Sequence, residues 1–273
     1  MGCLTDFSAN FSLLEGIFER VNNSSSEFFV VYKISDIKCQ YFQFKTTSTF
    51  QPAAFGGDEI AIKIQLPGKK CPTFNPLVSG PNSFTEKINN ELHTTTVSLD
   101  SKSKNIYNLS YKVTSCPNGM RLFQRRGTTV VCIGLFYFEA PRCNNQAQAS
   151  ALCKAQKGTL TGSANADEYG YIQNISNSSK YTANPDSFKY VTYWIDGAGT
   201  NTGYTFEDPT HNGITNYKWT PGSPHLKGPG SCLHNPGPFN SKIQSIECLE
   251  SYCCDDVCWR EALCQVPPKV ETS

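Results

Sequence analysis

The sequence has neither a long apolar run nor a block of like charge. No stretch is apolar for the length that a bilayer requires, so no membrane-spanning helix is predicted. The beginning also lacks the apolar core of a signal peptide, and we interpret the chain as a mature or truncated form without its leader. Lys and Arg (24) balance Asp and Glu (23), which leaves a net charge of +1. This balance argues against nucleic acid or an anionic membrane as partner.

Catalytic motifs are also missing. There is no Gly-x-Ser-x-Gly elbow and no His-Glu-x-x-His pair, and none of the four histidines adjoins a recognisable nucleophile. The nearest approach to a catalytic constellation is His225 and His234 together with Asp255 and Asp256. A hydrolytic site there is one hypothesis. We expect instead a protein that is not an enzyme and needs no cofactor.

Cysteine, by contrast, is abundant. Five of the thirteen cysteines lie between Cys248 and Cys264, and six Asn-x-Ser/Thr sequons begin at Asn10, Asn22, Asn23, Asn108, Asn174 and Asn177. Together these signals predict a secreted, disulfide-bonded glycoprotein. Clustered cysteines can also bind zinc, but the chain has no Cys-x2-Cys knuckle, so disulfides are the favoured interpretation.

Residues 1–114 have the pattern of an all-β domain. Runs rich in β-branched and aromatic residues, separated by turn formers, predict strands at 28–34, 39–46, 58–66, 92–99 and 106–113. Ile60, Ile62 and Ile64 alternate with less apolar residues, as in a strand with one buried face. Several short strands predict an antiparallel sandwich. The runs at 56–64 and 107–113 resemble a CUB-like domain.

The pattern changes near residue 115, where we place a domain boundary. Helical spacing begins at Ala149 and ends at Gly158, which is an expected C-cap, and a second helix is predicted at about 167–175. Cysteines at 116 and 132 bracket two strand-like segments that precede these helices. This mixture predicts an α+β domain at 115–267 and a tail at 268–273.

From Cys116 to about Gln265 the sequence resembles the C-type lectin-like domain, in the long form found in nematode members. The likeness rests on the order of several motifs: a Cys-Pro-x-Gly opening, the helix that carries Cys153, the run Trp194-Ile195-Asp196-Gly197, and the run from Tyr217 to Pro224. The resemblance implies that Trp194 and Trp219 are core residues. It also implies disulfides Cys116–Cys132, Cys153–Cys264 and Cys232–Cys258. Cys143, Cys248, Cys253 and Cys254 remain for two further bridges, with Cys253 and Cys254 each expected to reach one of the other two.

The same resemblance locates a candidate ligand site in the long loop, at about 205–232. Sugar-binding relatives carry a Glu-Pro-Asn or Gln-Pro-Asp motif there, which ligates calcium and sugar together. This chain has Ser223 and His225 around Pro224. Neither side chain suits a hard cation that prefers oxygen ligands. Asp255 and Asp256 remain as possible cation ligands, or as residues that cap a turn.

We therefore expect a secreted, non-catalytic recognition protein. Its ligand-binding residues would be Ser223, His225, Asp255 and Asp256, with no metal, and its partner would be a glycan or a protein surface. The alternative is a disulfide-stabilised interaction module without affinity for glycans.

Overall fold

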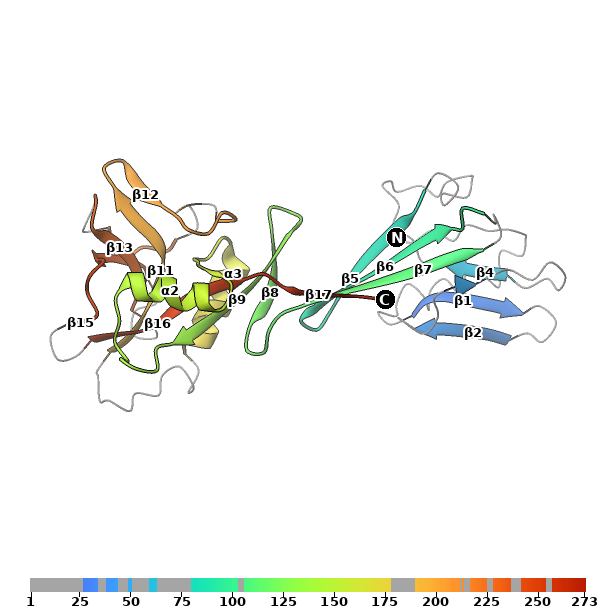
Figure 1. The fold of residues 1–273 in the computed structure, drawn as a ribbon, viewed down its shortest axis with the longest axis horizontal. Coiled ribbons are helices and arrows are strands. Elements are labelled where there is room, and N and C mark those ends of the chain that lie inside the picture. Colours follow the sequence, from blue (N-terminus) through green and yellow to red (C-terminus); the bar gives the residue numbers. More distant parts are fainter. Residues whose placement is uncertain are drawn as a thin grey trace. The chain divides into compact units, whose positions relative to one another are not determined.

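In the computed structural model the chain forms two units, each with its own sheets (Figure 1). The structure describes residues 27–33, 38–43, 49–50, 59–62, 80–102, 106–177, 190–211, 213, 217–224, 228–236, 242–253 and 257–273. Unit 1 comprises Met1–Ser115 and Val270–Ser273, and unit 2 comprises Cys116–Lys269. No helix among the described residues has both the length and the apolar character needed to cross a membrane.

The described part of unit 1 contains only strands. The first sheet is antiparallel, with β1 (Glu27–Lys33) between β2 (Lys38–Gln43) and β4 (Glu59–Ile62). These strands lie where the β-branched and aromatic runs predicted them. The similarity of 56–64 and 107–113 to a CUB-like domain falls partly outside the described residues and stays a prediction.

The second sheet of unit 1 is built on three long antiparallel strands. They are β5 (Asn82–Ile88), β6 (Glu91–Leu99) and β7 (Tyr107–Ser115), which lie side by side in Figure 1. The tight turn between β5 and β6 places Asn89 at φ +55°, a left-handed conformation that asparagine tolerates better than most residues. Tyr107, Leu109, Tyr111 and Val113 are buried at alternate positions of β7, so one face of this sheet is apolar.

The outer edge of β7 is paired with two short strands. These are β3 (Thr49–Phe50) and β17 (Lys269–Thr272). Tyr111 donates its N–H to the carbonyl of Ser273 at 2.9 Å, and Ser273 donates back at 3.0 Å. Residues 268–273, which we expected to be a tail, therefore contribute a strand to the sheet of unit 1.

Unit 2 is organised around one mixed sheet. Its main strands, in spatial order, are β14 (Gln244–Glu247), β13 (Ser231–Asn235), β11 (Tyr190–Thr200), β16 (Val257–Val266), β9 (Thr129–Tyr137) and β8 (Arg121–Arg125). Short strands pair at its margins: β10 (Thr159–Leu160) and β15 (Tyr252–Cys253) with β16, and β12 (Gly203–Thr205) with β11. Only β11 and β16 run parallel; the other described pairs are antiparallel.

Two helices accompany this sheet, and each begins after an asparagine. They are α2 (Gln146–Ala155) and α3 (Ala166–Ser176). The side chain of Asn145 accepts the N–H of Gln148 at 3.2 Å, and that of Asn165 accepts the N–H of Glu168 at 2.9 Å. These caps satisfy backbone donors that have no partner within the helix. Both predicted helices are thus present, and the first begins earlier than predicted.

Gly158 takes part in the C-cap of α2 through its N–H, which donates to the carbonyl of Cys153 at 3.0 Å, but it is not the residue in the left-handed conformation. α2 ends at Ala155, and the residue in the left-handed conformation after it is Lys157, with φ +61°. Gly158 instead lies against β16, where an added Cβ would stand 2.1 Å from the carbonyl oxygen of Gln265. Any larger residue at this position would push the end of α2 away from the sheet.

Four disulfides connect the described cysteines of unit 2. Cys116–Cys132 and Cys153–Cys264 are the pairs that the sequence predicted. The predicted pair Cys232–Cys258 is wrong: Cys232 bonds Cys248, and Cys258 bonds Cys143. The expectation that Cys143 and Cys248 pair with Cys253 and Cys254 is therefore wrong as well.

Strand order gives the physical reason for this correction. Cys232 is on β13 and Cys258 is on β16, and β11 lies between those two strands. Two strand spacings separate them by roughly 9–10 Å, more than the roughly 7 Å that a disulfide can span between Cα atoms. The β13–β14 hairpin instead brings Cys232 and Cys248 to a Cα–Cα distance of 4.8 Å.

Aromatic residues form much of the core of unit 2. Trp194 and Trp259 are both buried and stack with ring centroids 5.7 Å apart. Trp219 is partly buried and packs on the cluster that contains Tyr217 and Ile243. Trp194 and Trp219 thus occupy core positions, as the sequence predicted.

We expect residues 116–269 to fold as an isolated fragment, because their buried clusters and all four described disulfides use only residues of this range. Limited proteolysis should leave the fragment intact under conditions that degrade its reduced form. If the fragment is recovered only as aggregate while the full chain is soluble, the boundary is wrong. Residues 1–115 alone, which lack β17, should unfold more readily than unit 1 of the full chain.

Candidate functional site

The sequence-predicted site residues are only partly described. Ser223 lies in the turn after Trp219, where its N–H donates to the carbonyl of Thr220 at 2.8 Å. Its hydroxyl oxygen is buried and has no hydrogen-bond partner. His225, Asp255 and Asp256 lie outside the described residues. The structure therefore gives one member of the predicted set, and it lies next to a pocket.

This pocket, which we call the loop pocket, has a volume of about 460 Å³ and opens beside the β11–β12 hairpin. Its described lining consists of Thr200, Asn201, Thr202, Gly203, Tyr204, Phe206, Gly213, Pro224 and Gly228. None of these nine described residues carries a charge. The hairpin provides hydroxyl and amide groups, while Tyr204, Phe206 and Pro224 provide apolar surface.

Two glycines allow the chain segments around the loop pocket to approach one another. An added Cβ at Gly199 would lie 2.1 Å from Ser231 Oγ and 2.2 Å from the carbonyl oxygen of Gly228. Gly228 itself has φ +100°, a conformation that favours glycine. The end of the long loop can therefore pack directly against β11.

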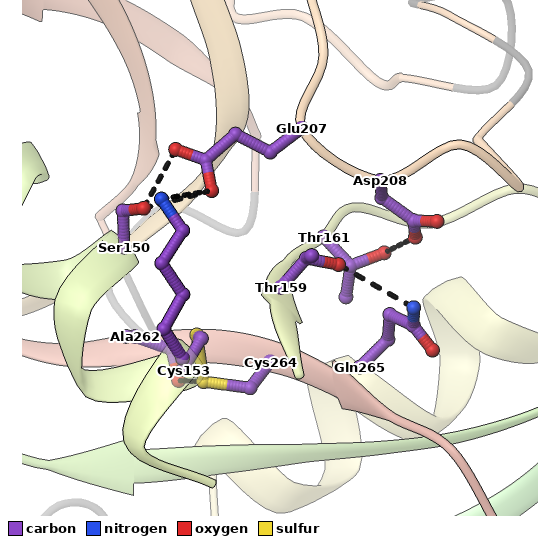
Figure 2. The surroundings of a disulfide bond; sticks show 10 residues. Ser150, Cys153, Thr159, Thr161, Glu207, Asp208, Ala262, Cys264 and Gln265 are labelled. Carbon is purple, nitrogen blue, oxygen red and sulfur yellow. Dashed lines mark hydrogen bonds and ion pairs between the residues drawn. A yellow bond between two sulfur atoms is a disulfide. The ribbon is translucent and has the colours of Figure 1, made fainter. Parts of the chain in front are cut away.

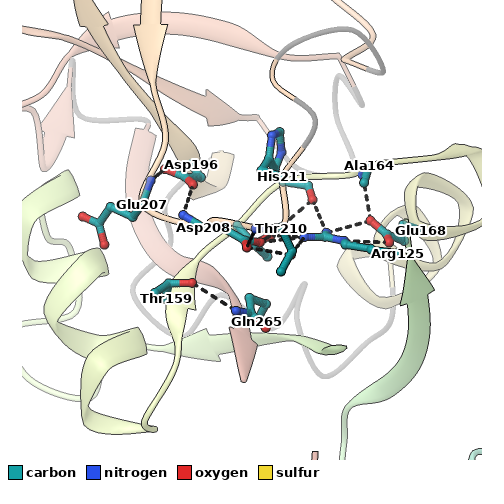
Figure 3. A network of polar contacts seen from close by, with 12 residues as sticks. Arg125, Thr159, Ala164, Glu168, Asp196, Glu207, Asp208, Thr210, His211 and Gln265 are labelled. Carbon is teal, nitrogen blue, oxygen red and sulfur yellow. Dashed lines mark hydrogen bonds and ion pairs between the residues drawn. The ribbon is translucent and has the colours of Figure 1, made fainter. Parts of the chain in front are cut away.

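The beginning of the long loop is held by a buried ion network centred on Arg125 of β8 (Figure 3). Arg125, Glu168 and Asp208 are at most 2% exposed. The Arg125 guanidinium donates to both Glu168 oxygens at 2.9 and 2.8 Å and to Asp208 Oδ2 at 2.6 Å. It also donates to the carbonyl of Gly162 at 2.8 Å. One cation thus joins β8, α3 and the loop.

Asp208 is held as a carboxylate by its surroundings. Burial alone would raise its pKa, but hydrogen bonds from Thr161 and Thr210 and the charge of Arg125 outweigh burial and lower the pKa. Thr161 donates to Asp208 Oδ2 at 2.6 Å, and Thr210 donates its N–H and hydroxyl to Oδ1 at 2.8 and 2.7 Å. The network therefore contains a real charge pair, with every Asp208 oxygen satisfied.

Asp196 of the Trp-Ile-Asp-Gly run holds the same loop segment from another side. Its two carboxyl oxygens accept the N–H groups of Glu207 at 3.0 Å and Asp208 at 2.8 Å. Burial raises its pKa to about 7, and the two N–H donors oppose that rise. The loop therefore leaves β12 along a fixed path.

Glu207 adds a contact with α2 near the disulfide that closes the domain. Ser150 donates its hydroxyl to Glu207 at 2.6 Å (Figure 2). Lys154 lies 3.4 Å from the same carboxylate. Both residues flank Cys153, which bonds Cys264 of β16. The Lys154–Glu207 pair is exposed, so its electrostatic contribution to stability is small.

His211 forms the buried end of this loop segment. Its ring stacks on Phe206, with centroids 4.7 Å apart, and its Nε2 lies 2.9 Å from the Tyr217 hydroxyl. Burial, together with the nearby Arg125 charge, lowers the pKa of His211 to about 4. His211 is therefore neutral and supports Phe206, which lines the loop pocket.

Of the two histidines proposed for a hydrolytic site, His234 is described, and it is part of the core. His234 is 4% exposed and packs against both Trp194 and Trp259, with centroid distances of 6.1 and 5.5 Å. Burial lowers its pKa to about 3. A neutral imidazole buried against two indoles cannot reach a bound substrate, so the hydrolytic constellation loses this member. No group of three His, Cys, Asp or Glu side chains suited to a metal occurs among the described residues.

One further buried carboxyl was not predicted. Glu261 of β16 is 2% exposed, and its Oε1 has no hydrogen-bond partner. Burial raises its pKa to about 8, and the neighbouring charge of Arg260 opposes the rise. The carboxyl is therefore protonated at neutral pH.

These features define the fold of unit 2. Two helices accompany a mixed sheet, a disulfide joins α2 to β16, and the long loop lies between β12 and β13. Unit 2 has a C-type lectin-like fold. The resemblance seen in the sequence between Cys116 and Gln265 is thus confirmed for the fold.

Comparison with known proteins gives matches among solved structures alone; no family model and no curated protein matches the chain. A calcium-independent type II antifreeze protein aligns at 16% identity over 57% of this chain and 97% of its own, with a TM-score of 0.41. The carbohydrate-recognition domain of cow CD23 aligns at 18% identity over 56% and 97%, with a TM-score of 0.39. The calcium-independent C-type lectin SPL-2 from Saxidomus purpuratus aligns at 18% identity over 55% of this chain and 93% of its own, with a TM-score of 0.38. These likenesses concern the C-type lectin-like fold and say nothing about a ligand.

We predict that Arg125→Met lowers the free energy of unfolding of unit 2 by about 3–5 kcal/mol, because it leaves two buried carboxylates without their cation. All three tryptophans lie in unit 2, so tryptophan fluorescence of the full chain during urea titration reports this unit alone. Lys154→Met is the matched control: its side chain is 63% exposed, and we expect a change of less than about 1 kcal/mol. Equal effects of the two substitutions would contradict a central role for Arg125.

The free energy of unfolding of unit 2 should be greatest between about pH 4.5 and 6.5, because two buried histidines and two buried carboxyls have opposite effects that balance in this range. The pKa values of His211 and His234 are lowered from 6.5, so the unfolded chain binds more protons below that pH, and acid destabilises the fold. The pKa values of Glu261 and Asp196 are raised to about 8 and about 7, so the folded chain retains protons that the unfolded chain loses, and alkali destabilises it. Each group contributes a slope of about 1.4 kcal/mol per pH unit within its window.

Urea titrations from pH 4 to pH 9, followed by tryptophan fluorescence, would measure this profile. Glu261→Gln should reduce the loss of stability at alkaline pH and leave the loss at acidic pH unchanged. His234→Gln should reduce the loss at acidic pH and leave the loss at alkaline pH unchanged. A stability that changes in one direction over the whole range would contradict the assignment.

Proposed function

We propose that the chain is a secreted, non-catalytic recognition protein whose unit 2 binds a neutral glycan in the loop pocket. The observation that carries the proposal is the lining of this pocket, in which hydroxyl, amide and aromatic groups occur and no described residue is charged. A ligand with many uncharged hydroxyls and apolar faces between them fits such a surface. Charged ligands would lose hydration there without gaining a partner among the described residues.

The two kinds of lining group have separate roles. Thr200, Asn201 and Thr202 at the hairpin can exchange hydrogen bonds with sugar hydroxyls, which fixes the orientation of a ligand. Tyr204 and Phe206 offer apolar ring surface to the C–H faces of a sugar. Phe206 is held from behind by His211, and Tyr204 lies 6.2 Å from Trp219 between ring centroids. These rings are thus already positioned, which reduces the entropy lost on binding.

We further propose that binding does not require calcium. The residues in place of the calcium-binding pair of sugar-binding relatives are Ser223 and His225. Serine has no charge and a short side chain, and a histidine nitrogen is a poor ligand for a cation that prefers six to eight oxygens. The hydroxyl of Ser223 is instead buried beside Pro224, which lines the loop pocket.

The secreted location is supported by the four disulfides, since such bonds persist in oxidising compartments. The sequence has no long run of basic residues and a net charge of only +1, which argues against nucleic acid as a partner. A protein ligand on the same loop, without any affinity for glycans, is the alternative outcome of the binding experiment.

We expect a neutral oligosaccharide selected on a glycan array to bind equally well in calcium and in chelator. Asn201→Ala should weaken its binding about tenfold, the effect of one or two hydrogen bonds lost. Isothermal titration calorimetry of the full chain measures both effects. Thr205→Ala is the matched control, because Thr205 lies on the same hairpin and does not line the loop pocket.

Three results would contradict the proposal. If the protein binds no glycan on the array but captures a protein ligand, the alternative of a protein-interaction module is favoured. Loss of binding in chelator, or a micromolar calcium affinity abolished by Asp255→Ala, would show a calcium site. A Thr205→Ala variant as weak as Asn201→Ala would place the ligand elsewhere.

A further inference from the structure

One face of the second sheet of unit 1 carries a cluster of small hydroxyl side chains. Ser83 and Thr96 face each other across β5 and β6 with their oxygens 2.6 Å apart, and Thr85 and Thr94 do so at 2.8 Å. The register of β6 and β7 places Ser110 opposite Thr96. Residues directly opposite in a sheet share a face, so these hydroxyls form one surface.

This hydroxyl face is defined by Ser83, Thr85, Thr94, Thr96, Ser98, Asn108 and Ser110, and each of these side chains is exposed or half-buried. Ser83, Thr85 and Ser110 are exposed, whereas Leu109 and Tyr111 on the opposite face of β7 are buried. The hydroxyl face therefore does not belong to the core of unit 1. Its described members are uncharged, and Lys112 of β7, opposite Thr94, lies at its margin.

A sequon lies within the hydroxyl face. Asn108, Leu109 and Ser110 form an Asn-x-Ser sequence on β7, and Asn108 is opposite Ser98 on β6. Strand alternation points Asn108 and Ser110 to the same side and turns Leu109 into the core. Asn108 Nδ2 donates to Asp100 Oδ2 at a distance of 3.4 Å, which is a weak contact.

The sequon at Asn174 has a different setting. Asn174 is exposed near the end of α3, but the Ser176 hydroxyl of that sequon is buried and donates to the carbonyl of Gln173 at 3.0 Å. Asn108 and Asn174 thus offer a comparison between a sequon within the hydroxyl face and one on a helix.

We propose that Asn108 carries an N-linked glycan whose first sugars lie on the hydroxyl face. The bond forms between Asn108 Nδ2 and the anomeric carbon of an oligosaccharide carried on a polyprenyl pyrophosphate. The carbon–oxygen bond to the pyrophosphate breaks, the electron pair leaves with the pyrophosphate oxygen, and Nδ2 gives up one proton, which the released pyrophosphate takes up. The remaining amide N–H can still face Asp100. This inference presupposes the secretory route of the proposed function and is independent of ligand binding by unit 2.

A tethered glycan is the occupant that suits this surface. Hydrogen bonds to exposed hydroxyls replace bonds to water, so each contributes little net affinity. A free sugar bound to this face would also lose its translational freedom. A sugar attached at Asn108 avoids that loss, because its effective concentration over Ser110 and Thr96 is high. The hydroxyl face can therefore order an attached glycan although it cannot capture a free one.

The experiment expresses the full chain, behind a secretion signal, in a eukaryotic cell. Glycans are removed with a peptide amidase in heavy-oxygen water, which converts each occupied Asn to labelled Asp, and sites are mapped by mass spectrometry. We expect label at Asn108 and its loss in Ser110→Ala. Release from the native protein should be about tenfold slower at Asn108 than from the denatured protein, because the glycan is held by one or two net hydrogen bonds. Thr94→Val with Thr96→Val should remove that delay and leave occupancy unchanged.

Every other result contradicts a specific part of the proposal. Label at Asn174 or another sequon without label at Asn108 would refute the modification. Label at Asn108 with equally fast release from native and denatured protein, or a delay insensitive to the two valine substitutions, would refute the packing on the hydroxyl face. Absence of label at every sequon would refute both this inference and the secretory route, while leaving the binding of a glycan to unit 2 to calorimetry.

Discussion

The shape of the candidate binding site depends on one buried guanidinium. Arg125 donates from Nε and from both terminal nitrogens, and its partners come from α3, from the segment after β10 and from the start of the long loop. Burying three charges is unfavourable unless every group is paired. Such a network adds little net stability compared with apolar packing, but it strongly disfavours any other position of Asp208. It therefore specifies where the loop begins.

The rest of the loop pocket follows from that anchor. With Asp208 fixed, Phe206 stacks on His211, and His211 contacts Tyr217. Gly162 is necessary here, since an added Cβ would lie 1.8 Å from the Tyr217 hydroxyl. The far end of the loop is fixed where Cys232 bonds Cys248. A loop anchored at both ends by rigid elements can display a pre-shaped surface.

Much of this fold could be predicted from local sequence. The features that were predicted wrongly or missed depend mainly on long-range geometry. The two helices, five strands of unit 1 (β1, β2, β4, β6 and β7) and the Cys153–Cys264 bridge follow from periodicity and family resemblance, whereas β3, β5 and β17 were not predicted. The pairing of Cys232 could not be predicted, because it depends on β11 lying between β13 and β16. Arg125 gave no signal, because a lone arginine in a strand usually faces solvent and its carboxylate partners are 43 and 83 residues away. The available signal was the position of Arg125 in β8, a strand in which Leu122 and Phe123 are also buried.

Among the described residues, uncharged hydroxyl groups gather in the loop pocket and on the hydroxyl face, and the two surfaces imply different uses. The loop pocket is concave and includes two aromatic rings, so a ligand there removes apolar surface from water as well as forming hydrogen bonds. The hydroxyl face has no aromatic member, so hydrogen bonding to it is nearly balanced by the loss of hydrogen bonds to water. Affinity for a free sugar therefore requires the loop pocket. Order in a sugar that is already attached requires only the hydroxyl face, and that difference is why we assign recognition to unit 2 and modification to unit 1.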